Sequence, residues 1–345
     1  MADFEFNRRQ LMGALAVGAV ASTIALPELA FAQAPSGSAI QAALTRAYDR
    51  YKSLNEGKNA DYIPALAEVP SNYFGVAIVT ADGKVYQAGD STQLFSIQSV
   101  SKPITAALVM QESGEQLIED SVGVDATGQV FNSITAVEQY RGKEMNPLVN
   151  PGAIATVGNV KGSPDEVWNK ILKIHSDMAG RQLAVNQPVY ESEAATNQRN
   201  RAIGALMSAY ERFPSDPAVA VDVYTRQCSI NVSAVDLANM AATLAFGGRQ
   251  PVTRQQVLDA DIVPGVLAIM ATAGMYDDSG KWAFHTGGVP AKSGVGGGIL
   301  AVVPGKFGIG TFAPPLDDAG NSVRGQRAII DIVNELKANP YAQFG

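Results

Sequence analysis

The sequence predicts a mixed α/β (α+β) fold, in which one antiparallel sheet built from both chain ends is flanked by helices. Two observations support this. Apolar, β-branched segments surround an Asp-Gly pair near residue 82 and a Pro-Gly pair near residue 304, an arrangement typical of β-hairpins. The residues between the two hairpins show helical spacing of apolar side chains, broken by Gly and Pro. We therefore expect a mostly helical subdomain inserted between the halves of the sheet.

The expected elements follow one another in a simple order. They are a helix over 40–52, strands over 74–80 and 84–87, helices over 167–175, 201–211, 234–246 and 262–272, strands over 298–303 and 306–312, and a helix over 326–337. This order predicts one domain over 33–345. Its sheet subdomain takes about 33–110 and 275–345, and its helical subdomain takes about 111–274.

Composition narrows the possible functions. The chain has 345 residues, 46% hydrophobic and 17% charged, which suits a globular protein with a large core. Its net charge of −7 argues against nucleic acid as a partner, because phosphate binding needs a basic face. The single cysteine, Cys228, excludes an intrachain disulfide, and with only His175 and His285 a Cys/His zinc site is not expected. We expect no metal and no organic cofactor.

The first 32 residues have the pattern of an export signal. Arg8 and Arg9 precede an apolar run over 11–26, and Ala30-Phe31-Ala32 fits a small-x-small cleavage site. The paired arginines predict the twin-arginine route, with a periplasmic or secreted mature protein and no stable membrane association after cleavage. A membrane anchor is the alternative, but the apolar run is short for a bilayer span.

A first candidate site is the Ser-x-x-Lys pattern at Ser99 and Lys102, where a helix is expected to begin. Side chains three positions apart share a helix face, so a buried, uncharged lysine amine can take a proton from the serine. Free backbone N–H groups at a helix start can also stabilise an oxyanion. Alone, the pattern fits a capping serine beside a solvated lysine better.

A second candidate site is Lys292-Ser293-Gly294, directly before the second hairpin. It is similar to the Lys-Thr-Gly box of β-lactamases and penicillin-binding proteins, whose lysine supplies positive charge and whose strand edge donates a backbone N–H. Alone, a Gly-rich turn explains it better. A nucleotide P-loop is excluded, because Ala291 stands where that motif needs glycine.

Together, the two motifs have the order and context of the serine acyl-transfer fold that β-lactamases and penicillin-binding proteins share. The sequence resembles the serine-dependent glutaminases, which have that fold. The matching segments are 61–64, 98–103, 146–154, 192–193, 199–204, 224, 227–230, 240–248, 274–277, 279–280 and 290–304. The resemblance therefore covers nearly the whole chain after the expected signal.

This resemblance implies an amidohydrolase that converts L-glutamine to L-glutamate and ammonia through a serine-linked glutamyl-enzyme. It implies Ser99 as the nucleophile, Lys102 as its base and Tyr62 as an aid to proton transfer. The implied glutamine pocket consists of Gln98, Ser99, Asn150, Glu193, Asn200, Tyr224, Tyr276 and Val295. The backbone N–H groups of Ser99 and Val295 would form the oxyanion hole, supported by Lys292, Ser293 and Gly294. Relatives suggest a homodimer or homotetramer.

Two alternatives stay open at this point. One is a penicillin-recognising acyltransferase or esterase of the same fold, although Glu193 with Asn200 suits a free amino acid better than a peptide. The other is a non-catalytic protein that binds exported glutamine, although retention of both Ser99 and Lys102 argues against it. Parallel assays with glutamine and a β-lactam distinguish a glutaminase from the penicillin-recognising enzyme. Glutamine binding without ammonia release would identify the non-catalytic binding protein.

Overall fold

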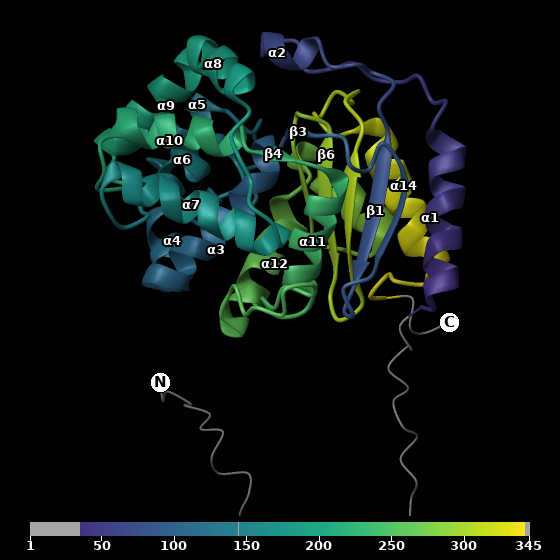
Figure 1. Ribbon diagram of the computed structural model, residues 1–345. Helices are drawn as coiled ribbons and strands as arrows, with labels where there is room; N and C mark the ends of the chain where they lie inside the picture. Colours follow the sequence, from purple (N-terminus) through teal and green to yellow (C-terminus); the bar gives the residue numbers. More distant parts are fainter. Residues whose placement is uncertain (1–34, 144, 342–345) are drawn as a thin grey trace, which may run out of the picture. The chain divides into compact units, whose positions relative to one another are not determined.

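The structure is a computed structural model that describes residues 35–143 and 145–341, so the expected signal over 1–32 lies outside the described residues. The described chain has an antiparallel five-stranded sheet flanked by helices, which confirms the predicted fold class (Figure 1). None of its helices is both long and apolar enough to span a membrane.

The bounds of the elements are as follows. The strands are β1 (Gly75–Thr80), β2 (Val85–Gly89), β3 (Phe95–Ser96), β4 (Asn231–Val232), β5 (Ala291–Ser293), β6 (Gly298–Val303) and β7 (Phe307–Phe312). The α-helices are α1 (Gly37–Tyr51), α2 (Pro64–Ala67), α3 (Lys102–Ser113), α4 (Glu115–Ser121), α5 (Ile134–Tyr140), α6 (Asn150–Gly158), α7 (Pro164–Ala179), α8 (Gln187–Thr196), α9 (Gln198–Ala209), α10 (Pro217–Cys228), α11 (Ala234–Ala245), α12 (Val263–Ala273), α13 (Ser279–Thr286) and α14 (Val323–Glu335). Short 3₁₀ turns cover Gln98–Ser101, Ala260–Ile262 and Tyr276–Asp278.

The five-stranded sheet has the order β2-β1-β7-β6-β5, and all neighbours are antiparallel. The hairpins β1–β2 and β6–β7 are those that the turn residues predict. Strand β1 pairs with β7 from Gly75 opposite Phe312 to Thr80 opposite Phe307. A strand from the N-terminal part of the chain thus lies beside one from the C-terminal part, inside the sheet. The short strand β5 forms an edge and carries the Lys-Ser pair of the second motif.

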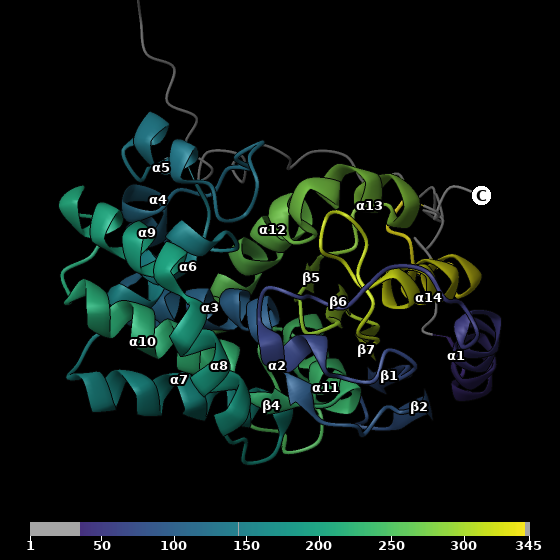
Figure 2. The ribbon, with the colours of Figure 1, turned by 90° about the horizontal axis from the view of Figure 1, so that it is seen from above.

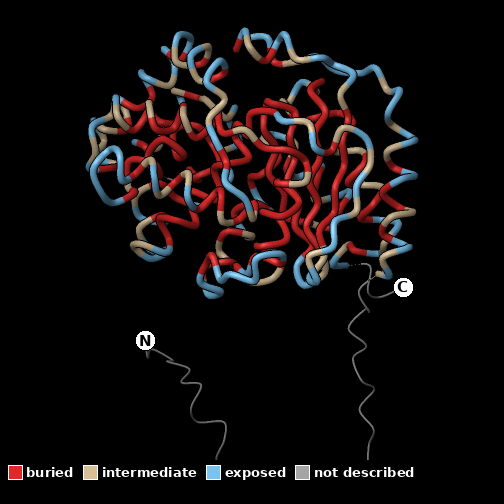
Figure 3. Tube along the Cα trace, in the orientation of Figure 1, coloured by how far each residue is buried: buried red, intermediate tan, exposed pale blue. Residues whose placement is uncertain are grey.

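Helices cover both faces of this sheet. Helices α1 and α14 pack against each other and against one face (Figure 1). Side chains alternate along β1, so Val76 and Ile78 join the core under α1 and α14, whereas Ala77 and Val79 face the opposite side. That side is covered by α11, which contacts β1, β6 and β7. Strands β1, β6 and β7 and helices α11 and α6 are buried almost throughout, whereas the edge strand β2 is partly exposed (Figure 3).

Helix α11 approaches β7 very closely because two glycines of the strand face it. A Cβ atom added at Gly308 would overlap with backbone atoms of Ala242 and Ala238, and one at Gly310 would overlap with backbone atoms of Ala234 and Ala238. Small residues on both elements thus let the helix lie directly on the strand backbone.

We expect Gly308→Ala to lower the free energy of unfolding by about 3 kcal/mol, because the new methyl group meets backbone that cannot rotate away. Gly280→Ala is the matched control, since a Cβ atom there meets nothing within 4 Å. Urea unfolding of both variants measures the difference. Equal stability of the two variants would contradict this packing.

Helices α3 to α10 form a second group next to the sheet (Figure 2). Helix α10 packs against α6, α7, α8 and α9, and α3 contacts α4, α6, α7 and α12. The two-residue strands β3 and β4 pair, with Ser96 opposite Asn231, and so join the segment before α3 to the segment after α10. This joint positions the residues of the first motif.

Candidate active site

Ser99 lies in a tight turn held at both ends. Before it, the Ile97 N–H donates to Ile230 O at 2.8 Å, continuing the β3–β4 pairing. Gln98 then takes a left-handed conformation with φ +50°, and Ser99 follows in a 3₁₀ turn. The helix expected to open at Ser99 therefore begins three residues later, at Lys102.

A buried polar network holds this turn. The Ser101 hydroxyl donates to Gln98 O at 2.7 Å and accepts from Gln227 Nε2 at 2.9 Å. The other end of the Gln227 amide accepts from the Thr105 hydroxyl at 2.7 Å. A left-handed residue other than glycine costs about 1–3 kcal/mol, so the conformation of Gln98 depends on such surrounding bonds. Gln227, on α10, thus connects the Ser99 turn to the helical group.

A pocket of about 280 Å³ opens in front of Ser99. Eight of the expected site residues line it: Tyr62, Gln98, Ser99, Asn150, Glu193, Asn200, Tyr224 and Val295. They come from the segment before α2, the 3₁₀ turn, helices α6, α8, α9 and α10, and the loop after β5. The volume lies near the lower end of the range for small-molecule sites, so the pocket suits a compact ligand.

Lys102 lies buried behind the wall of this pocket, with 1% of its surface exposed. Its Nζ donates to Leu148 O at 3.2 Å and to Asn150 Oδ1 at 2.7 Å, and no bond to Ser99 is formed in the described residues. Burial lowers the pKa of Lys102 to about 8, against the opposing charges of Cys228 and Glu193. An uncharged amine has two N–H groups, so these two acceptors satisfy it and leave its lone pair free.

Asn150 connects Lys102 to the pocket. Its Oδ1 accepts from Lys102 and, at 3.2 Å, from the Tyr224 hydroxyl, while its Nδ2 donates to Asn200 Oδ1 at 3.0 Å. Asn150 is the first residue of α6, and it is buried. This chain of bonds fixes the orientation of three amide and phenol groups that face a ligand.

Glu193 is a buried carboxylate with a neutral partner. It is 6% exposed and accepts from Gln98 Nε2 at 3.2 Å. Burial raises the pKa of Glu193 to about 7, against the opposing effects of the Gln98 hydrogen bond and the Lys102 charge. It forms no ion pair within the described residues. Because an unpaired buried carboxylate is costly, Glu193 is suited to a cation that arrives with the ligand.

Tyr276 stands beside Ser99 at the edge of the pocket rather than among its lining residues. It has φ +53°, and its ring lies 5.1 Å from the Phe131 ring, centroid to centroid. Its hydroxyl is buried without a hydrogen-bond partner in the described part of the chain. Burial raises the pKa of Tyr276, and the neighbouring Ser99 hydroxyl acts against that rise. A neutral phenol next to Ser99 can therefore donate to a bound ligand.

The second motif lies directly behind Tyr276. Lys292 Nζ sits 4.1 Å from the Tyr276 ring centroid and donates to Gly274 O at 3.2 Å and to Ser293 O at 2.7 Å. Lys292 is fully buried, and burial lowers its pKa well below the ordinary value, helped by repulsion from Lys102. Two buried amines close together each make protonation of the other less favourable.

The residues after Lys292 bring the strand edge to the Ser99 turn. A Cβ atom at Gly294 would lie 2.9 Å from Ile97 O, so only glycine allows this approach without a shift. Ser293 is fully buried, and its hydroxyl has no partner within residues 35–143 and 145–341. The backbone N–H of Val295, two residues after Ser293, donates to no acceptor in the described chain. It is therefore free for a ligand oxygen.

Tyr62 reaches the pocket from its rim. It is 54% exposed, yet it lines the same pocket as Ser99 and Glu193. The protein around its hydroxyl raises the pKa of Tyr62 above the ordinary value, and the nearby Tyr276 and Glu193 add to the rise. Tyr62 is therefore a neutral phenol at neutral pH, able to give or relay a proton.

Several pocket residues were not expected to act there. The pocket is also lined by Ile63, Phe131, Asn132, Thr196, Asn197 and Arg199. Arg199 directly precedes Asn200 in the sequence. Its positive charge beside an expected pocket residue could have indicated that Arg199 also lines the pocket. Phe131 comes from an irregular loop with no sequence pattern that points to a pocket.

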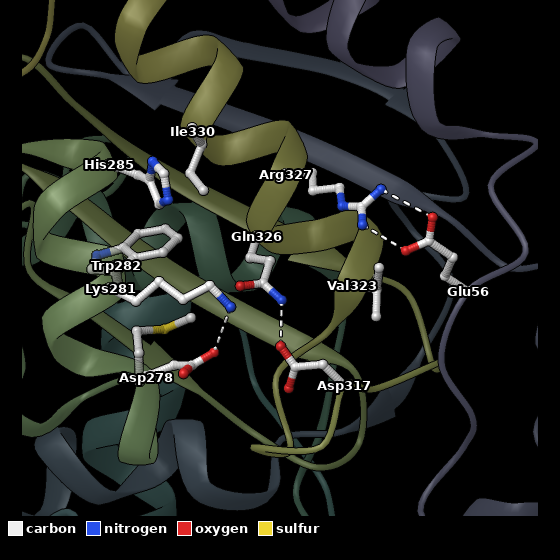
Figure 4. A pocket seen from close by; sticks show the side chains of 11 residues that line it. Glu56, Asp278, Lys281, Trp282, His285, Asp317, Val323, Gln326, Arg327 and Ile330 are labelled. Atoms are coloured by element: carbon white, nitrogen blue, oxygen red, sulfur yellow. Dashed lines mark hydrogen bonds and ion pairs between the residues drawn. The ribbon is translucent and has the colours of Figure 1, made fainter.

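His285 lies in a different hollow from Ser99. This pocket, of about 290 Å³, is formed by α13, α14 and neighbouring loops, and His285 lines it near Trp282 (Figure 4). None of the expected catalytic or substrate-binding residues lines it. Across the described residues, no group of three His, Cys, Asp or Glu side chains is placed to hold a metal ion.

A serine in a 3₁₀ turn, a buried lysine at the start of the following helix and a Lys-Ser-Gly strand edge, on an antiparallel sheet flanked by helices, are features of the β-lactamase-like fold class. The Glutaminase family model matches residues 57–341. A glutaminase of Colwellia psychrerythraea (strain 34H) is 50% identical over 309 residues, covering 89% of this chain and 99% of that protein. Glutaminase 1 of Escherichia coli (strain K12) is 48% identical over 303 residues, covering 88% and 97%.

Solved structures give the same result. A probable glutaminase, ybaS, has a TM-score of 0.87 at 47% identity, covering 89% of this chain and 99% of that one. A probable glutaminase from Bacillus subtilis, complexed with 6-diazo-5-oxo-L-norleucine, has a TM-score of 0.75 at 29% identity, covering 88% and 95%. The chain belongs to the glutaminase family, and it is an enzyme that hydrolyses glutamine to glutamate.

Proposed function

We propose that glutamine hydrolysis proceeds through a glutamyl ester on Ser99, with Lys102 as the base. The Ser99 oxygen attacks the side-chain amide carbon, and Lys102 takes the serine proton. The C–N bond then breaks, and ammonia leaves with that proton. Water attacks the ester, which releases glutamate and restores the Ser99 hydroxyl.

The observation that carries this proposal is the state of Lys102. Its pKa of about 8 makes the uncharged amine accessible near neutral pH. The two N–H groups of that amine donate to Leu148 O and Asn150 Oδ1. Its lone pair therefore has no partner among these groups and can accept a proton. Catalytic hydrogen bonds are often long before substrate binds, so the Ser99 proton can be reached in the complex.

Other groups have supporting roles in this proposal. The N–H groups of Ser99 and Val295 stabilise the oxyanion, because preorganised donors act where negative charge develops. Tyr62 relays the proton to the leaving nitrogen, and the Tyr276 hydroxyl donates next to Ser99. Lys292, Ser293 and Gly294 hold the strand edge in place.

The pocket recognises a free amino acid in this proposal. Glu193 pairs with the α-ammonium group, and the hydrogen-bonded amides of Gln98, Asn150 and Asn200 face the rest of the substrate. The phenol of Tyr224 is fixed by the same bonds. Such buried polar groups reject analogues that lack their partners.

The test of this function is a panel of substrates on the purified enzyme. We expect ammonia release from L-glutamine and far less from D-glutamine, whose α-groups cannot all reach the same partners. L-Asparagine, one methylene shorter, tests the reach from Glu193 to Ser99. Turnover of a chromogenic β-lactam at a rate comparable with L-glutamine would instead favour the penicillin-recognising alternative.

The pH profile gives a second expected result. Protonation of Lys102 removes the base as pH falls through about 8, and protonation of Glu193 removes the partner of the α-ammonium group as pH falls through about 7. Therefore kcat/KM should fall twice on acidification. The kcat profile should keep only the Lys102 step, because bound substrate keeps Glu193 ionised. A kcat/KM that stays flat through both values would contradict these roles.

We further propose that residues 1–32 direct export by the twin-arginine route, so that the mature enzyme is periplasmic or secreted. Separately, we propose that the enzyme assembles as a homodimer or homotetramer. The paired Arg8 and Arg9 before an apolar run support the export proposal. Arg8→Lys with Arg9→Lys should retain the full-length protein in the cytoplasm. Normal export of that double variant, measured by cell fractionation, would contradict the route.

A further inference from the structure

A larger groove continues from the substrate pocket on its Tyr62 side. It has a volume of about 630 Å³ and is formed by residues 56–62 and 316–320 with parts of the adjoining loops. Tyr62, Phe131 and Val295 line both the groove and the pocket. The two hollows are therefore neighbours at those three residues, next to the reacting centre.

This junction lies on the leaving-group side of the proposed reaction. In the proposed reaction Tyr62 relays a proton to the departing nitrogen, and Tyr62 lines both the pocket and the groove. The nitrogen of glutamine itself carries only hydrogens and needs no space beyond Tyr62. A substituent on that nitrogen would enter the groove while the glutamyl part keeps its contacts with Glu193.

The charges along the groove select the kind of substituent. Asp61 is paired with Lys58 at 3.2 Å, and Glu56 is paired with Arg327 (Figure 4). Asp317 accepts from Gln326 Nε2 at 2.6 Å, which is a neutral partner. Asp318 is exposed, and neither it nor Asp317 has an ion pair within the described residues. The groove thus carries uncompensated negative charge, which favours a cation.

We propose that the enzyme also hydrolyses γ-glutamyl amides whose nitrogen carries a short aminoalkyl chain, held in this groove. This inference rests on the proposed Ser99 mechanism. The Ser99 oxygen forms the ester bond with the γ-carbonyl carbon, and the C–N bond breaks. The amine leaves with the proton that Lys102 took from Ser99, and water then releases glutamate.

Glutamate release from three substrates tests the proposal: L-glutamine, γ-glutamyl aminobutylamide and γ-glutamyl butylamide. We expect the aminobutylamide to exceed the neutral butylamide in kcat/KM by about tenfold at low salt, and added NaCl should reduce this ratio. Equal values for the two amides, or no glutamate from either while L-glutamine is turned over, would overturn the proposal. No glutamate from any of the three would contradict the glutaminase activity itself, whereas turnover of L-glutamine by Ser99→Ala would contradict the Ser99 mechanism.

Charge variants locate the effect. Asp317→Asn combined with Asp318→Asn should bring the ratio of aminobutylamide to butylamide close to one. Asp165→Asn, an exposed carboxylate at the start of α7, is the matched control and should leave the ratio unchanged. A ratio that survives in the double variant would overturn the role of the groove.

Discussion

Replacing Ser99 by alanine is expected to lower kcat for glutamine hydrolysis by at least about 10³-fold, because no other nucleophile is assigned to the ester-forming step. The pocket should persist in this variant. Its polar groups are held by bonds that do not involve the Ser99 side chain, namely those among Lys102, Asn150, Asn200 and Tyr224. Glutamine should therefore still bind, which calorimetry measures directly.

Ser38→Ala is the matched control for this substitution. Ser38 is exposed on α1 and does not line the pocket. Its replacement should leave both kcat and KM unchanged. Ammonia release by Ser99→Ala within tenfold of the unaltered enzyme would show that another group attacks the amide.

Replacing Lys102 by methionine is expected to lower kcat by about 10²- to 10⁴-fold, the range for losing a general base. Methionine has a similar length and fits a fully buried site. The Asn150 oxygen keeps its bond from Tyr224, so only Leu148 O loses its side-chain donor. We therefore expect the free energy of unfolding to change by less than about 3 kcal/mol.

The pH dependence distinguishes a lost base from a distorted site. Residual activity of Lys102→Met should no longer show the kcat step near 8 that we assign to this amine. Lys173→Met, at an exposed lysine of α7, is the matched control and should keep the step. Persistence of the step in Lys102→Met would assign it to a different group.

The parts of the fold predicted from the sequence are those that local chemistry determines. Asp82-Gly83 and Pro304-Gly305 specify tight turns, and the apolar runs beside them pair as β1–β2 and β6–β7. The stripe of Ile329 and Val333 on α14 lies in the core, as expected for an amphipathic helix. Each of these features depends on residues close together in the chain.

The features missed from the sequence depend on distant contacts. Strands β3 and β4 have only two residues each, too few for a recognisable pattern, and they pair across more than a hundred residues of sequence. The left-handed conformation at Gln98 depends on the network from Gln227. The lone pair of Lys102 could not be inferred either, because its acceptors, Leu148 and Asn150, come from a separate loop and helix.

Residues of the site were predicted through a resemblance, and the pocket brings most of them together. Single residue types would not have sufficed, since a buried tyrosine such as Tyr224 is more often part of a core. Phe131 lines the pocket from a loop without periodicity, so only its tertiary position reveals it. The sequence alone therefore predicts the polar groups of the site better than its apolar walls.

The most direct test of the central claim is to locate the nucleophile with a diazoketone analogue of glutamine, followed by mass spectrometry of the digested enzyme. The relative from Bacillus subtilis has been solved with such a compound, 6-diazo-5-oxo-L-norleucine. We expect one label, on the peptide that contains Ser99, and much slower labelling of Lys102→Met. A label on Cys228 or on any other side chain, with Ser99 unmodified in inactivated enzyme, would contradict it.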